Sequence, residues 1–163
     1  MGKQCSTWLT PVNVPVALDG ATAFGSIEPD AGNYANALGR HTVTELHSDD
    51  RMNLTEVVSN AISDVAHRYE LHPSHSPSST VTIVHIRDQH VDLFILGDAP
   101  LYDTQYRRRI LDRRNRPRHT PRDNATLAVH DLSWAVLATD GITNSLTHLG
   151  RAGWAAIATI SFI

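Results

Sequence analysis

Hydrophobic residues along the chain fall into short runs and periodic stripes that predict a mixed α and β domain. Three short apolar runs end at a pair of aspartate and glycine, which is typical of buried strands stopped by a turn. The runs cover residues 14–18, 91–96 and 134–139, and the pairs are Asp19-Gly20, Gly97-Asp98 and Asp140-Gly141. These three segments are the first strands that the sequence predicts.

Two stretches repeat apolar residues at helical spacing. The clearer one forms a single stripe from Leu54 to Tyr69, and Asn53 can cap it because Glu56 follows three places later. The weaker one covers residues 31–48 and is interrupted by Gly39. The pattern therefore predicts two consecutive helices whose apolar faces belong to a core.

A hairpin is predicted next. The β-branched run 80–86 and the apolar run 91–96 flank a polar turn at 87–90, and a loop rich in proline and serine precedes them at 73–79. Residues 103–124 are rich in arginine and poor in apolar side chains, which predicts an insert. We expect residues 1–13 to be irregular, residues 14–163 to form one domain, and residues 142–160 to form a helix broken near Gly150.

This order of elements predicts an α+β fold: a layered sandwich of antiparallel β-sheets flanked by helices, incomplete at its ends. A chain of 163 residues with 41% hydrophobic and 19% charged side chains suits one globular domain. Its net charge of -3 gives no general attraction to nucleic acid. No stretch reaches the ~20 apolar residues of a membrane span, and a single cysteine favours a cytoplasmic setting.

The candidate chemistry lies in the aspartates at the strand ends. Asp19, Asp98 and Asp140 would project from one rim of the β core, where three carboxylates repel one another unless a cation or a proton neutralises them. Oxygen ligands of this kind suit hard divalent ions. The pattern therefore predicts a metal site and metal-assisted hydrolysis, whereas the alternative for each aspartate is a structural turn.

Four stretches, in this order, resemble the protein phosphatase 2C family, the metal-dependent serine/threonine phosphatases, and above all its compact actinomycete-type members. They are Val16-Ala17-Leu18-Asp19-Gly20-Ala21-Thr22, Ser78-Ser79-Thr80-Val81-Thr82-Ile83-Val84, Leu93-Phe94-Ile95-Leu96-Gly97-Asp98 and Val136-Leu137-Ala138-Thr139-Asp140-Gly141. Trp154 resembles a tryptophan that follows the last Asp-Gly in those members. The likeness spans roughly residues 14–160, apart from the arginine-rich insert.

The resemblance implies two antiparallel sheets flanked by helices, with two Mg²⁺ or Mn²⁺ ions that activate a water for attack on a phosphoserine or phosphothreonine of a phosphoprotein. It implies that Asp19 bridges both ions, that the Gly20 carbonyl binds one, and that Asp140 is a further ligand. Asp98 would lie at the edge of the site. No catalytic residue is expected beyond these ligands.

The chain also departs from the family. Residues 1–18 contain neither an acidic residue nor an arginine, where the family carries an Asn-Glu-Asp type element and a phosphate-holding arginine. The family's final strand and its Asp-Asp or Asp-Asn motif are missing, and no serine follows Asp98. We therefore expect a chain shortened at both ends, with an incomplete ligand set.

The run Arg107, Arg108 and Arg109 opens a segment with eight arginines in sixteen residues. Such a segment can form a solvated surface, contact the phosphate of a substrate peptide, or bind nucleic acid. Three functions stay open: a phosphatase, an inactive relative that acts as a binding module, and, less favoured, a nucleic-acid-binding domain. The sequence predicts neither a zinc site among the histidines nor an oligomeric state.

Overall fold

The computed structural model describes residues 5–9, 13–21, 28–73, 75–97, 101–103, 108–111, 122–131 and 135–137. Its elements, in chain order, are β1 (Cys5–Leu9), β2 (Val16–Ala21), α1 (Ala31–Ser48), α2 (Leu54–Arg68), β3 (Ser78–Arg87), β4 (His90–Leu96), β5 (Leu101–Asp103), β6 (Arg108–Leu111), β7 (Arg122–Ala128), the 3-10 turn η2 (Val129–Asp131) and β8 (Ala135–Leu137).

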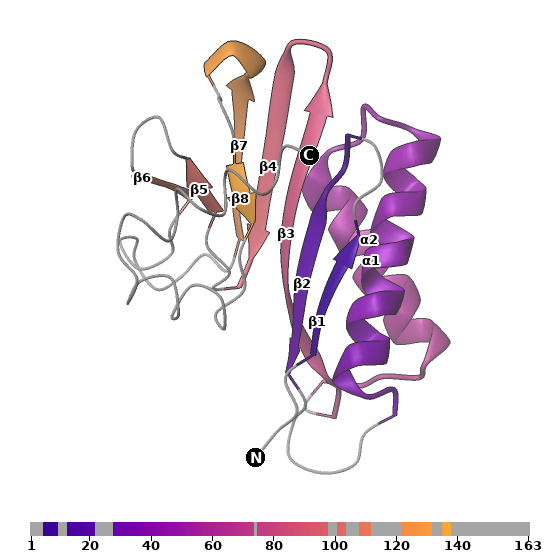
Figure 1. Cartoon of the computed structure of the whole chain (residues 1–163). Coiled ribbons are helices and arrows are strands. Elements are labelled where there is room, and N and C mark those ends of the chain that lie inside the picture. The colour runs from indigo at the N-terminus through magenta and orange to yellow at the C-terminus, as the bar shows by residue number, and fades with distance from the viewer. Residues whose placement is uncertain are drawn as a thin grey trace.

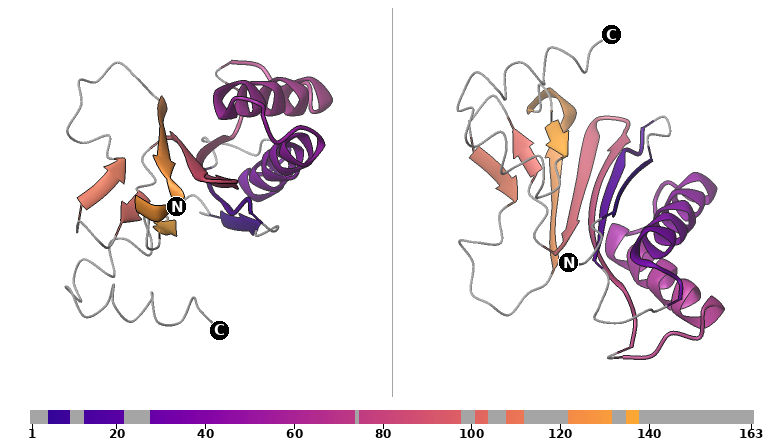
Figure 2. Two further views of the ribbon diagram at one scale, coloured as in Figure 1. Left: turned by 90° about the horizontal axis from the view of Figure 1, so that it is seen from above. Right: turned by 60° about the horizontal axis from the view of Figure 1, so that its bottom comes forward.

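The elements form an α+β arrangement in layers. Five strands make an antiparallel sheet in the order β1-β2-β3-β4-β7, and three more make a second sheet in the order β6-β5-β8. The two helices cover one face of the larger sheet, where α1 contacts β1, β2 and β3 and α2 contacts β4. The second sheet lies on the other side, as both views in Figure 2 show. The α+β class is confirmed, whereas a phosphatase-type sandwich remains a prediction.

The main core lies between the larger sheet and the helices. Alternate residues of the central strands enter it, such as Leu18 of β2, Ile83 of β3 and Phe94 of β4, and each of these three is at most 1% exposed. The helices contribute residues at helical spacing, including Leu38 of α1 and Val57 of α2. Full burial of side chains of this size stabilises a fold by about 1.5–3 kcal/mol each, so this layer holds the domain together.

A second, smaller core lies on the opposite face of the same sheet. Val84, Val91, Leu93 and Ile95 form it, and Leu137 of β8 packs against it. Side chains of a strand point alternately to the two faces. The continuous apolar runs of β3 and β4 therefore reflect strands that are buried on both sides.

Both predicted helices are confirmed. Asn53 begins α2 by accepting a hydrogen bond from the Thr55 amide at 2.8 Å, and Asp30 does the same for α1 with the Asn33 amide at 2.7 Å. The helix α1 continues through Gly39, where the sequence indicated an interruption. No helix in the part of the chain that the structure describes is long and apolar enough to cross a membrane.

The predicted hairpin is confirmed as β3 and β4, which are joined by a turn at Asp88 and Gln89. Asp88 adopts a positive φ of 45°, which aspartate tolerates better than most residues. The last apolar run is confirmed in part, because β8 lies within it. The helix predicted over 142–160 lies outside the described residues.

The prediction that residues 1–13 are irregular was wrong for residues 5–9, and the segment predicted to be an insert contains strands. Residues 5–9, expected to be irregular, form β1 and pair along their length with β2. The arginine-rich segment contains β6 and the start of β7, and β7 completes the larger sheet beside β4. Ala125 and Leu127 of β7 pack on the second core, while Asn124 and Thr126 are exposed. Such a strand carries only a short apolar alternation, so tertiary pairing decides its conformation.

Candidate functional site

The end of the larger sheet where β2 finishes and β3 begins carries the first aspartate-glycine pair. Asp19 lies directly opposite Thr80, and Gly20 lies opposite Ser79. The prediction of a turn at this pair was wrong, because both residues belong to β2 and its ladder continues to Ala21. In Figure 1 this end of the sheet is the lower one.

Asp19 projects away from the helices. Leu18, its neighbour in the strand, belongs to the core beneath the helices, so Asp19 points to the face that carries the second core. Residues directly opposite in an antiparallel pair share a face, with their Cβ atoms about 4.5–5.5 Å apart, so Thr80 lies beside Asp19. Asp19 is 7% exposed, which makes it a buried acidic residue at a sheet end.

Close packing at this end explains its two glycines. A Cβ atom on Gly20 would lie 2.5 Å from the carbonyl oxygen of Ala31, the first residue of α1. A Cβ atom on Gly97, just after β4, would lie 2.8 Å from the Thr80 methyl, and Gly97 has a φ of +96°. Larger residues would therefore push α1 or β4 away from this end.

The hydroxyl groups of β3 complete the local geometry. Ser79 donates to the Thr80 carbonyl at 2.8 Å, and Ser78 donates to the Ala21 carbonyl at 3.3 Å. The Thr80 hydroxyl is buried and has no hydrogen-bond partner in the structure. A buried hydroxyl without a partner is costly, and this one lies beside a carboxylate.

Most of the other predicted site residues lie outside the described part. Asp98, Asp140 and Arg107 are not among the described residues, and Arg108 and Arg109 are described only as backbone positions of β6. The structure therefore brings together Asp19 and Gly20 with Thr80 and Gly97, and it leaves the other candidates unplaced. Within the described ranges, no three His, Cys, Asp or Glu side chains gather closely enough to hold a metal ion.

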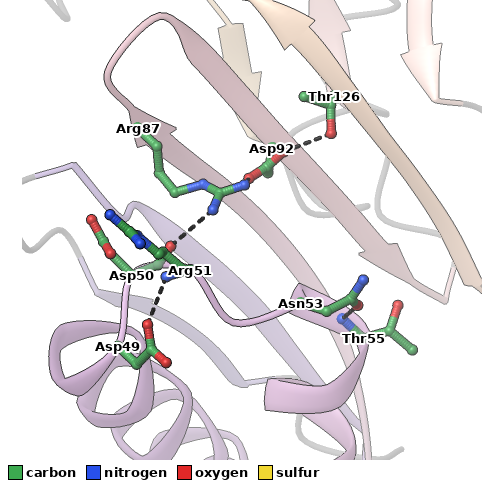
Figure 3. Close-up of polar contacts among 8 residues, drawn as sticks. All are labelled: Asp49, Asp50, Arg51, Asn53, Thr55, Arg87, Asp92 and Thr126. Atoms are coloured by element: carbon green, nitrogen blue, oxygen red, sulfur yellow. Dashed lines mark hydrogen bonds and ion pairs between the residues drawn. The ribbon is translucent and has the colours of Figure 1, made fainter.

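A second polar cluster, which the sequence did not reveal, connects the helices to the other end of the sheet (Figure 3). Arg87 of β3 forms an ion pair with Asp92 of β4 and donates to the Asp50 carbonyl at 3.2 Å. Thr126 of β7 donates to the other carboxylate oxygen of Asp92 at 2.6 Å. Arg87 thus ties residues 49–53, here called the α1–α2 connection, to two strands of the sheet.

A groove of about 410 Å³ lies between the α1–α2 connection and the strands β4 and β7. Its polar side chains are Arg51, Asn53, Arg87, Asp92, Asn124 and Thr126. The helices do not cover Asn124 and Thr126, which are exposed. Both members of the Arg87–Asp92 ion pair line the groove.

His85 lies next to this pair but is buried, with 3% of its surface exposed. Burial first, and the positive charge of Arg87 second, lower the pKa of His85 from its ordinary value of 6.5, while Asp92 and Asp50 oppose the shift. The sequence predicted no zinc site among the histidines and did not single out His85. The one signal in the sequence for the burial of His85 was the alternation of the strand, because His85 falls on the same face as Val81 and Ile83.

The chain was compared with known proteins by family, by sequence and by structure. No protein-family model, no curated protein and no solved structure matches it.

Proposed function

We propose that this chain is a phosphatase-like domain of the protein phosphatase 2C type, which uses Mg²⁺ or Mn²⁺ to hydrolyse phosphoserine or phosphothreonine in a phosphoprotein. The observation that carries the proposal is the ordered set of four motifs, the first two of which meet at one end of the sheet. There the buried Asp19 lies opposite Thr80, and Gly97, which precedes Asp98, packs on Thr80. The proposed fold is the two-sheet sandwich of that family.

The residues at this end have the chemistry that a hard cation requires. Asp19 offers a carboxylate and Gly20 a carbonyl, and the nearby Thr80 hydroxyl has no partner. Oxygen donors are the preferred ligands of Mg²⁺ and Mn²⁺. A buried carboxylate also binds a cation more strongly than an exposed one, because less water screens the charge. In this proposal Asp19 and the Gly20 carbonyl hold the ions, together with Asp140 and, at the edge, Asp98.

The connectivity of the strands supports the inclusion of Asp140. Leu101 of β5 follows Gly97 by four positions, a span of at most about 14 Å in extended chain. Leu101 pairs with Leu137 of β8, and Asp140 follows Leu137 by three residues. The end of β8, which precedes Asp140-Gly141, therefore lies beside the start of β5, a short length of chain after Gly97.

When bound, the ions would supply a water of lowered pKa and positive charge next to the phosphoryl group. The chain's own residues have simpler tasks. Asp19 keeps a fixed negative charge at the sheet end, and the Gly20 backbone lets α1 pack closely beside it. We propose that Arg107, Arg108 and Arg109 contact the substrate, since guanidinium groups bind phosphate in two-pronged hydrogen bonds.

Hydrolysis of para-nitrophenyl phosphate by the full chain, with and without Mn²⁺, tests the proposal. We expect Mn²⁺-dependent turnover that falls more than about 100-fold in Asp19→Asn, since even groups that only support a metal ligand contribute about 10–100-fold. Asp88→Asn is the matched control, because Asp88 lies in the β3–β4 turn. The control should keep its activity.

A melting experiment with Mn²⁺ separates binding from turnover. At a concentration of 100 times the dissociation constant, binding stabilises the fold by about 2.7 kcal/mol, and Asp19→Asn should lose most of this gain. A folded chain that shows neither turnover nor a Mn²⁺-dependent shift would contradict the proposal.

The second candidate is a relative that binds metal or partners without catalysis. The lack of any acidic residue or arginine in residues 1–18 favours it. It predicts the Mn²⁺-dependent stabilisation, with loss of that effect in Asp19→Asn, but no turnover.

A further inference from the structure

His85 occupies an unusual place in the sheet. It is almost fully buried, and its Nδ1 atom has no hydrogen-bond partner in the structure. It lies on β3 directly opposite Asp92 of β4, and two residues before Arg87 on the same face. A neutral imidazole at this position therefore adjoins an ion pair in which it takes no part.

The carboxylate of Asp92 holds Arg87 in place. One carboxylate oxygen contacts the Arg87 guanidinium, and the other accepts from Thr126. The same guanidinium donates to the Asp50 carbonyl, 37 residues away in the chain. Figure 3 shows this route from Thr126 through Asp92 and Arg87 to Asp50. Any group that competes for Asp92 therefore weakens the hydrogen bond by which Arg87 holds the α1–α2 connection to the sheet, here called the tether.

A proton on His85 creates such a competitor. Protonated imidazole donates from both nitrogens, so the Nδ1 atom becomes a charged donor opposite Asp92. The charged and titratable groups that act on His85 come from each element around it: His47 from α1, Asp50 from the connection, Arg87 from β3 and Asp92 from β4. The new positive charge attracts Asp92 and Asp50 and repels Arg87 and, when that residue is charged, His47.

We propose that His85 is a proton-operated switch: its protonation draws Asp92 away from Arg87 and releases the α1–α2 connection from the sheet. The released connection carries Arg51 and Asn53, which line the groove, so acidification changes the wall of the groove. None of these residues lies at the Asp19 end of the sheet, so the switch does not depend on the proposed phosphatase activity.

The direction in which pH acts on the switch follows from the linkage between proton binding and the release of the α1–α2 connection. The pKa of His85 is lowered while the residue is buried beside Arg87, and release returns it toward 6.5. The released state therefore binds more protons, and a fall in pH favours it. Between about pH 7.5 and about pH 5.5, a group with a pKa near 6.5 in the released state and a lower one in the tethered state shifts the equilibrium toward release by at most about tenfold.

Hydrogen exchange of the full chain, corrected for the intrinsic effect of pH, tests the switch. The amides of Arg51 and Met52 report it, because both are hydrogen-bonded to Asp49 within the connection. We expect their exchange to rise up to about tenfold over this pH range in the unmodified chain. The rise should vanish in His85→Gln, which cannot take up a proton.

His90→Gln is the matched control, because His90 is exposed at the start of β4 on the same hairpin. It should keep the rise. Asp92→Asn weakens the ion pair directly, so both amides should exchange rapidly at both pH values. A rise that persists in His85→Gln, or slow exchange in Asp92→Asn, would overturn the switch.

One measurement needs no variant, so it decides the matter even if His85→Gln fails to fold. Nuclear magnetic resonance of the unmodified chain follows the His85 ring and the Arg51 and Met52 amides during one titration. The switch requires a ring midpoint below 6.5 that coincides with the midpoint of both amides. Amides that do not respond, or that titrate with a different midpoint, refute it.

Discussion

The contact between Gly97 and Thr80 gives the sharpest test of how the Asp19 end of the sheet is built. In Gly97→Ala, the added methyl would lie 2.8 Å from the Thr80 methyl carbon and 3.0 Å from its Cβ atom. The substitution also places a side chain at a φ of +96°, which residues other than glycine rarely adopt. Two separate costs therefore arise at one position.

Their sum can be estimated. The strained backbone costs about 1–3 kcal/mol, and the overpacked methyl adds about 1–3 kcal/mol. Alanine returns about 0.4–1 kcal/mol by restricting the unfolded chain. We therefore expect Gly97→Ala to lower the free energy of unfolding by about 3 kcal/mol, a large part of the 5–15 kcal/mol typical of a domain.

The Thr80→Ser background separates the two costs. It removes the methyl that the new side chain meets most closely and keeps the hydroxyl and the Cβ atom at 3.0 Å, so most of the remaining cost, about 1 kcal/mol, should come from the backbone. Urea unfolding of the four chains, followed by circular dichroism, gives the coupling, which we expect to be about 2 kcal/mol. If Gly97→Ala costs the same in both backgrounds, Thr80 is not the obstacle and this account of the sheet end is wrong.

Three further predictions concern the core, the helix cap and pH. Phe94→Ala should lower the free energy of unfolding by about 3–5 kcal/mol in urea unfolding, because Phe94 is 1% exposed in the main core, and Phe94→Leu should cost much less. Asn53→Ala should lower the stability by about 1 kcal/mol in thermal melting, because it removes the cap of α2, whereas Asn53→Ser should keep most of the stability since serine also caps helices. Burial and Arg87 lower the pKa of His85, so the folded state binds fewer protons than the unfolded one. The free energy of unfolding should therefore fall as the pH drops below about 6.5. An equal fall in His85→Gln would refute this.

Local sequence patterns were sufficient for the helices and the hairpin. The stripe from Leu54 to Val65 repeats with the period of one helix face, and Asn53 marks its start, so α2 could be predicted nearly to the residue. The hairpin needed only two β-branched or apolar runs and a short polar turn. These signals depend on residues close together in the chain, so the elements can be predicted without knowledge of the strands that pair with them.

Candidate chemistry was only partly accessible. The sequence singled out Asp19 and Gly20, but it read them as a turn, whereas pairing with Thr80 and Ser79 makes them part of β2. Nothing local indicates that pairing, because Thr80 lies 61 residues away. The Arg87–Asp92 pair is closer in sequence, yet its contacts with Asp50 and Thr126 come from distant segments.

The amino-acid order by itself determined the α+β class, both helices and the strands buried on two faces, because periodicity and caps act over a few residues. Tertiary structure alone decided that residues 5–9 and 122–128 become strands of the sheet, since their own patterns are weak and backbone pairing with β2 and β4 supplies the stability. It also decided that His85 is buried beside an ion pair. Burial and electrostatics depend on every element packed around a residue, and that neighbourhood exists only once the layers have assembled.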